Sequence, residues 1–174
     1  MRRIFLIGIV LLYFLGCSNT DSEISKLKDT IKRYNELLIR GYRTMDMNIM
    51  REVATEWQAE TLYIHMAAMA EGDSRLEARL KKLEFVDINF ESANKAVVRT
   101  REVWDYAHYS IKTGAKTLEE KDFIYELGYH LEKQKDGRWL VARVVAIKTS
   151  DAKEDRPLKE PPRQFRKGRA VKIN

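Results

Sequence analysis

The sequence predicts an α+β domain in which N-terminal helices pack in the concave face of a curved, four-stranded antiparallel sheet. Three observations lead to this fold class. Apolar residues recur at helical spacing up to Lys82, they alternate with a period of two after it, and turn-forming segments separate the later stretches. Helices that come first, followed by strands joined through short connections, are typical of an α+β fold with a meander sheet.

Helices are expected in the first half of the chain. The first carries an apolar stripe at three- and four-residue steps, formed by Ile24, Leu27, Ile31, Tyr34, Leu37 and Leu38. A second helical region follows Asp46, a candidate N-cap, and continues through Met69 until Gly72 interrupts the pattern. Ser74 is a candidate cap for a short third helix that ends at Leu80.

Four strands are expected in the second half. A strand over residues 85–90 is followed by a turn at 91–95, a long strand over 96–111 and a loop at 112–117. A third strand has Phe123, Tyr125, Leu127, Tyr129 and Leu131 on one face. Asp136-Gly137 then supplies the positive φ of a hairpin, and Trp139–Ile147 closes the sheet.

The N-terminus has the parts of a secretory signal peptide over residues 1–16. Arg2 and Arg3 precede an apolar run of about twelve residues, which is shorter than the roughly twenty that span a membrane. Phe14-Leu15-Gly16-Cys17 resembles the lipobox of a bacterial lipoprotein. That resemblance implies lipidation of Cys17, with residues 17–23 as a short tether, against the alternative of an uncleaved signal anchor. It also implies a place in the bacterial cell envelope, at the outer membrane facing the periplasm, since Ser18 follows the cysteine.

The remaining chain divides into one domain, residues 24–148, and a tail, residues 149–174. No second cysteine is available for a disulfide, so the domain must be stabilised by its core. Nine basic and four acidic residues lie from Lys148 to Asn174, together with all three prolines. This composition favours a solvated, flexible tail.

The order of elements resembles the nuclear transport factor 2-like superfamily over roughly Lys26 to Lys148. The segments that carry the resemblance are Met45–Thr55, the strand from Val97 to Tyr109 and the ending Tyr129–Val141. The resemblance implies a conical cavity between helices and sheet, and it is closest to membrane-associated, non-catalytic members. The superfamily hosts many functions, so the fold leaves the activity open.

Enzymes of this superfamily place Asp, His or Tyr in an apolar pocket. On the strand 96–111, Glu102, Trp104, Tyr106 and His108 share one side, and Asp105 lies on the other. Glu102, His108 and Asp105 are therefore the candidate cavity residues for acid–base chemistry, against the simpler interpretation of a half-exposed sheet face. His65, Met66 and Met69 suit copper by ligand type, but methionines on an amphipathic helix usually pack in a core. We expect no metal and no cofactor.

The last strand is apolar on both sides, which predicts that both sides are covered. Trp139, Val141, Val145 and Ile147 are the candidate residues for contact with a protein partner or a second copy. In the tail, Arg163, Arg166, Lys167 and Arg169 are candidates for binding a polyanion such as a lipid headgroup. No nucleic-acid partner is expected.

The sequence thus favours a lipid-anchored periplasmic module, without catalysis, that holds a protein partner through the sheet surface or the cone mouth. The alternative is a binder of small hydrophobic ligands, or an isomerase- or dehydratase-like enzyme, that uses the cone. An open apolar cavity lined by Glu102, His108 or Asp105 would favour the alternative.

Overall fold

The computed structural model describes the backbone of residues 17–150 and the side chains of residues 20–148. The elements, in chain order, are helix α1 (Cys17–Thr44), the short 3₁₀ helix η2 (Asn48–Glu52), helix α2 (Glu56–Glu71) and strands β1 (Ser74–Ser92), β2 (Lys95–Ser110), β3 (Lys116–Lys133) and β4 (Trp139–Ser150). The predicted signal peptide and the tail beyond Ser150 lie outside the described residues.

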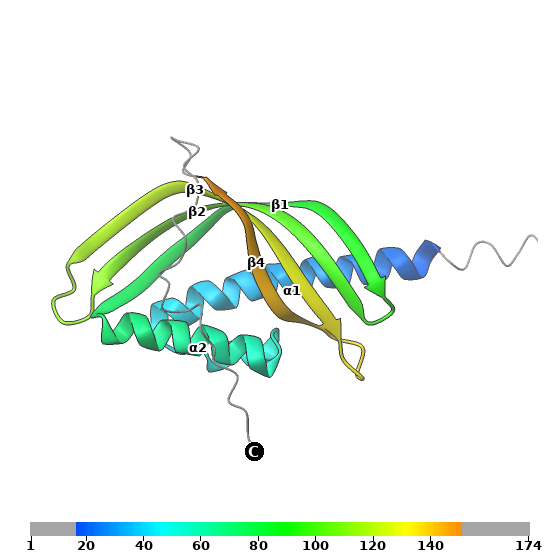
Figure 1. Ribbon diagram of the computed structural model, residues 1–174, viewed down its shortest axis with the longest axis horizontal. Helices are drawn as coiled ribbons and strands as arrows, with labels where there is room; N and C mark the ends of the chain where they lie inside the picture. The colour runs from blue at the N-terminus through cyan, green and yellow to red at the C-terminus, as the bar shows by residue number, and fades with distance from the viewer. Residues whose placement is uncertain (1–16, 151–174) are drawn as a thin grey trace, which may run out of the picture.

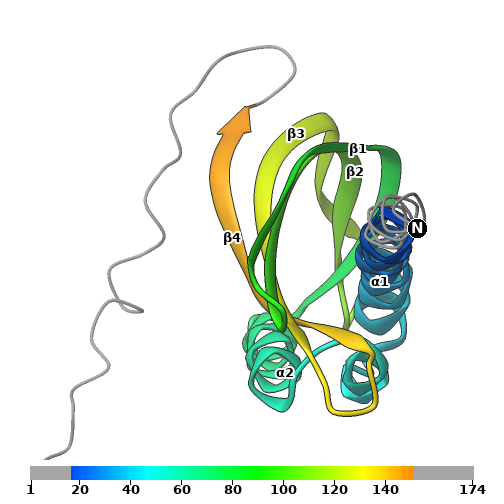
Figure 2. The ribbon, with the colours of Figure 1, turned by 90° about the vertical axis from the view of Figure 1, so that its right-hand side faces the viewer.

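The four strands form one antiparallel sheet in the order β1-β2-β3-β4. The strands arch over both helices, which lie on the same side of the sheet (Figures 1 and 2). The predicted α+β architecture, with a meander sheet and helices on its concave side, is confirmed.

Helix α1 buries the stripe that its spacing predicts. Leu27, Ile31, Tyr34 and Leu37 are all buried in the core. The helix begins at Cys17, so residues 17–23, expected to be a tether, are helical instead. Glu23 contributes to this extension, because its carboxylate accepts a hydrogen bond from Nε1 of Trp139 at 2.8 Å and pairs with Lys133 at 2.7 Å, which fixes the first turns to β3 and β4.

The second helical region differs from its prediction in where it starts. Asp46 does not cap a long helix; its side chain accepts a bond from the backbone N–H of Asn48, and only η2 follows. The chain then leaves the helical conformation because Val53 and Thr55 bond to the backbone of Val141 in β4. Thr55 is the N-cap of α2, with its side chain accepting from the N–H of Gln58.

The predicted short helix from Ser74 to Leu80 is wrong, because these residues form the first part of β1. Asp73 turns the chain with φ 58°, and its carboxylate accepts bonds from Ser110 and from the N–H of Lys112. This contact places Ser74 opposite Ser110, and the pairing with β2 continues from there. Local helix propensity is weak enough for such pairing to override it.

The remaining strands and turns agree with their predictions to within a few residues. Gly137 has φ 85° in the hairpin between β3 and β4, as the Asp-Gly pair predicts. Register shifts interrupt all three pairings, and those within β4 matter for the site below. In the described part of the chain no helix is both long and apolar enough to cross a membrane.

Candidate functional site

A cavity of about 690 Å³ lies between the helices and the concave face of the sheet and opens to solvent. Its walls are mainly apolar and aromatic. Residues of α1, α2 and all four strands line it, among them Tyr34, Leu38, Tyr42, Trp57, Leu62, Met69, Leu76, Ala78, Trp104, Tyr106, Tyr125, Leu127, Tyr129 and Val144. Most of the polar lining residues lie in two groups, and Thr61 and Arg143 line the cavity outside them.

The first polar group surrounds Glu102 on β2, a carboxylate with no solvent-exposed surface. Its Oε1 accepts hydrogen bonds from Tyr129 Oη at 2.8 Å, Thr100 Oγ1 at 3.0 Å and Asn35 Nδ2 at 3.4 Å. Its Oε2 accepts one from Trp104 Nε1 at 2.8 Å. The four donors come from α1, β2 and β3, so this one carboxylate joins a helix to two strands.

The phenols near Glu102 stay protonated. Burial, and then the charge of Glu102, raises the pKa of Tyr129 well above its usual value. Burial likewise raises the pKa of Tyr34, whose oxygen accepts a 2.8 Å bond from Gln58 Nε2. Both hydroxyls are therefore neutral at physiological pH, and that of Tyr129 donates to Glu102 while that of Tyr34 accepts from Gln58.

The second polar group contains two histidines. Nδ1 of His65 on α2 lies 2.6 Å from the hydroxyl of Tyr42, and Nδ1 of His108 on β2 lies 2.8 Å from Oγ of Ser74. Burial lowers the pKa of both imidazoles, and the charge of His108 lowers that of His65 further. Since burial also raises the pKa of Tyr42, its hydroxyl stays protonated and can donate to His65.

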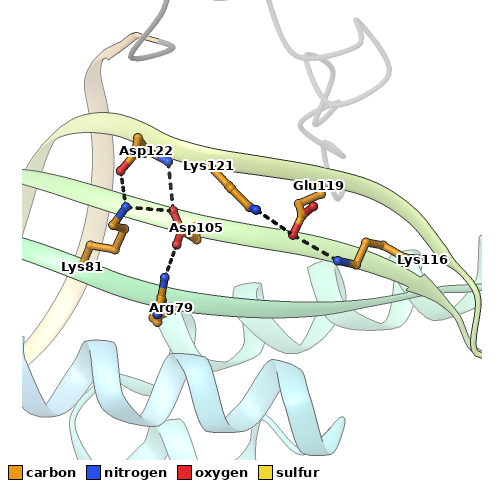
Figure 3. A network of polar contacts seen from close by, with 7 residues as sticks. All are labelled: Arg79, Lys81, Asp105, Lys116, Glu119, Lys121 and Asp122. Atoms are coloured by element: carbon orange, nitrogen blue, oxygen red, sulfur yellow. Dashed lines mark hydrogen bonds and ion pairs between the residues drawn. The ribbon is translucent and has the colours of Figure 1, made fainter.

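Strand parity explains which predicted residues reach the cavity. Glu102 and His108 line it together with Trp104 and Tyr106. Asp105 does not, because it lies on the opposite, outer face of β2. There its carboxylate accepts bonds from Arg79 at 2.6 Å and from the backbone N–H of Asp122 at 3.0 Å, beside Lys81 (Figure 3).

Asp105 thus belongs to an ion-pair network on the outer face. Lys81 also pairs with Asp122, and Glu119 lies between Lys116 and Lys121 (Figure 3). The bond from Arg79, followed by the bond from the Asp122 N–H, lowers the pKa of the Asp105 carboxyl. The prediction that Asp105 is a cavity residue is wrong.

The predicted partner surface on β4 does not form as one face. Trp139 and Val141 are buried in the core, at 3% and 0% exposure. A register shift around Ala142 then moves the next residues across the sheet, so that Val144 lines the cavity. Ile147 is 49% exposed and lies over Gly128 of β3, where an added Cβ would meet its side chain. Val145 is the residue that pairs with Gly128. The period of two fails here because the bulge adds a residue.

The predictions for lipidation, for polyanion binding and for the residues that suit copper are taken next. Cys17 is the first residue of α1, and its side chain lies outside the description, as do Arg163, Arg166, Lys167 and Arg169. Met66 packs in the core, whereas His65 and Met69 line the cavity. Within residues 17–150, no three His, Cys, Asp or Glu side chains come together as a metal site.

Sequence reasoning missed Asn35, Gln58 and the contact between Tyr42 and His65. Asn35 and Gln58 are buried polar residues on helix faces that are otherwise apolar. A polar residue beside a core stripe was an available signal, since buried amides need partners. Their partners come from elements far apart in the chain, so the sequence could not predict which residues they would be.

No protein-family model matches the chain, and no curated protein matches it. Among solved structures, the intermembrane-space region of the chloroplast protein ARC6 is similar, with a TM-score of 0.57 and 13% identity over 69% of this chain and 92% of that one. A ketosteroid isomerase-like protein from Erwinia carotovora atroseptica has a TM-score of 0.44 at 16% identity, over 68% of this chain and 95% of that one. A scytalone dehydratase-like protein from Novosphingobium aromaticivorans has a TM-score of 0.44 at 15% identity, over 82% and 99%. At 13% identity the likeness to the ARC6 region shows a nuclear transport factor 2-like fold alone.

Proposed function

We propose that this domain binds a small, largely apolar molecule in its cone and does so without chemistry, while a lipid on Cys17 holds it at the bacterial envelope. The observation that carries the proposal is the open cavity of about 690 Å³. Ligand sites are typically clefts of roughly 300–1,000 Å³, lined by apolar and aromatic side chains with a few placed polar groups. The lining described above has this composition.

The state of Glu102 supports binding over catalysis. A general base must come within hydrogen-bond reach of the proton that it removes. Glu102 has no exposed surface, and four donors already occupy its oxygens. These bonds make the carboxylate a fixed part of the wall that orients Tyr129 and Trp104 toward the cavity.

The partner-binding role expected from β4 has less support. Two of its four residues, Trp139 and Val141, are buried in the core and have no surface for a partner. The cavity, in contrast, draws residues from every helix and strand of the domain except η2. A small ligand is therefore the occupant that the geometry favours.

The proposed anchor has a geometric consequence. Because α1 begins at Cys17, no flexible tether separates a lipid on that residue from the domain. The first lining residue, Tyr34, follows seventeen positions later, about 25 Å along the helix at 1.5 Å per residue. The helix would act as a spacer between the bilayer and the cone.

A fluorescent apolar probe tests the binding proposal. The chain from Ser18 to Asn174 keeps every described element except the first residue of α1, and it is titrated with phenylnaphthylamine, which brightens in apolar sites. We expect saturable binding by the parent chain. Ala78→Phe, which fills part of the cavity, should weaken binding about tenfold, a loss of about 1.4 kcal/mol.

Ala93→Phe is the matched control, because Ala93 lies exposed in the turn between β1 and β2. This variant should bind the probe like the parent. Equal affinity of both variants, with the fold of each verified by circular dichroism, would refute binding inside the cone.

A further inference from the structure

The outer side of α2 carries large apolar side chains in water. Trp57, Tyr63 and Ile64 are 60%, 53% and 56% exposed. At 3.6 residues per turn they fall on the same side of the helix as Glu56, Glu60 and Glu71, which are also exposed. We call these six residues the α2 outer face. The buried residues Gln58, Ala59 and Met66 lie on the opposite side, against the core.

The charge on the α2 outer face is of one sign. All three of its charged residues are acidic, and Arg51 of η2 pairs with Glu56. Glu60 and Glu71 have no ion-pair partner among the described side chains. A recess of about 270 Å³ adjoins the face and is lined by Met47, Arg51, Glu60 and Tyr63, among others. Exposed apolar groups clustered beside a recess mark an interaction surface.

A fitting occupant must therefore supply cations together with an apolar or aromatic side chain. The chain itself contains such a segment beyond the described residues. Arg163, Arg166, Lys167 and Arg169 flank Phe165 in the C-terminal tail. Residues 151–174 contain eight basic and four acidic residues, opposite in net sign to the α2 outer face.

The tail is long enough to reach this face. Val141 of β4 is bridged to Ala54, three residues before Trp57, and β4 ends at Ser150. Those nine strand residues cover about 30 Å, and the fifteen residues from Ser150 to Phe165 can span up to about 50 Å. The end of β4 and helix α2 lie at opposite ends of the view in Figure 2, and this length of chain covers the separation.

We infer that the C-terminal tail of this chain binds the α2 outer face, with the cations around Phe165 facing Glu60 and Glu71. The interaction is intramolecular. Trp57 belongs both to the α2 outer face and to the lining of the cone, so the measurements below are made without a cone ligand. It assigns the basic cluster a site on its own domain, in place of the polyanion expected from sequence alone.

Trp57 provides the measurement. Trp104 and Trp139 are buried, so acrylamide quenching of tryptophan fluorescence reports mainly on Trp57. The chain Ser18–Asn174 is compared at low ionic strength with the same chain ended at Ser150. We expect the quenching constant to rise about twofold when the tail is removed, because an occupied face shields the indole. Raising the salt concentration from about 0.05 to 0.5 M should increase the quenching constant of the longer chain and leave that of the shorter chain unchanged.

Matched variants identify the charged residues that cause the shielding of Trp57. Replacing Arg163, Arg166, Lys167 and Arg169 by Gln should reproduce the loss of shielding, whereas Lys153→Gln with Lys159→Gln should retain most of it. Glu60→Gln with Glu71→Gln should also raise the constant, and Glu91→Gln, on the exposed end of β1, should not. Trp57→Phe should abolish the difference between the long and short chains.

Equal quenching of the long and short chains at low salt would overturn the inference. Shielding that increases with protein concentration would overturn it as well, since the occupant would then be a second chain. If the shortened chain does not fold, as judged by circular dichroism, the tail variants of full length decide the question.

Discussion

The hydroxyl of Tyr129 on β3 donates a 2.8 Å hydrogen bond to Oε1 of Glu102 on β2, in the wall of the cavity. Neither residue has more than 1% of its surface exposed. Bonds of a neutral donor to a buried carboxylate are strong, and leaving such a carboxylate short of donors is costly.

Tyr129→Phe should therefore lower the free energy of unfolding by about 1–3 kcal/mol, and Glu102→Gln by a similar amount, because each change leaves buried polar groups without a partner. Urea unfolding of the two single variants and the double variant measures the coupling. Purely additive effects would show that the bond contributes nothing specific.

Replacing Trp139 or Trp57 by alanine should affect stability and probe binding differently. Trp139→Ala empties a buried site against Phe90 and should cost about 3–5 kcal/mol of unfolding free energy. Trp57→Ala, at a mostly exposed position, should cost less than about 1 kcal/mol but weaken binding of phenylnaphthylamine, since Trp57 lines the cavity. Denaturation and probe titration test both statements, and a stable Trp139→Ala chain would contradict the placement of that residue in the core.

The two cavity histidines should make stability depend on pH. Burial lowers the pKa of His65 and His108 below 6.5, so the unfolded chain binds protons before the folded one as the pH falls. Stability should then decrease as the pH drops below about 6.5 and stop decreasing below the folded-state pKa values. Urea midpoints at a series of pH values should show this decline, and the variant with His65→Gln and His108→Gln should show less of it. His130→Gln, on the polar side of β3, is the matched control.

Glu23 should contribute stability in a different pH range. The bond from Lys133, followed by that from Lys26, lowers its pKa to about 2 from 4.5. Its contribution is therefore present above about pH 4.5 and is lost as the pH falls toward 2. Glu23→Gln should lower stability by about 0.5–1 kcal/mol at neutral pH and remove this part of the acid dependence, as followed by circular dichroism. An unchanged acid transition would mean that the fixed start of α1 does not depend on this carboxylate.

Asp105 tests the separation between the two faces of β2. Asp105→Ala breaks the outer-face network and removes an acceptor from the Asp122 N–H, so we expect a small loss of stability. Probe affinity should stay at the parent value, because Asp105 does not line the cavity. A loss of probe affinity as large as that expected for Ala78→Phe would mean that Asp105 contributes to binding in the cavity.

Periodicity was sufficient for most of the fold. The stripe from Leu27 to Leu37, the Asp136-Gly137 turn and the meander of late strands are local patterns, and all have the predicted form. The errors lie where distant backbone competes with local preference. Ser74–Leu80 became a strand because β2 pairs with it, and the helix after Asp46 is interrupted where Val53 and Thr55 bond to Val141.

The candidate site could be predicted in part, because strand alternation is also a local pattern. Alternation placed Glu102 and His108 on one side of β2, and the structure brings both to the cavity. Alternation failed on β4, where a bulge near Ala142 separated Trp139 and Val141 from Val145 and Ile147. It also could not reveal that Tyr42 meets His65, since that contact joins two helices.

The sequence by itself determined the class of fold, the placement of helices before strands and the concentration of positive charge near the C-terminus, because these depend on spacing and composition along the chain. Only the tertiary structure decided that the cone is open, that Glu102 is enclosed by four donors and that α2 presents Trp57, Tyr63 and Ile64 to water. Burial and hydrogen bonding depend on which side chains meet across elements. Curvature and bulges of the sheet decide those meetings, and neither follows from a local repeat.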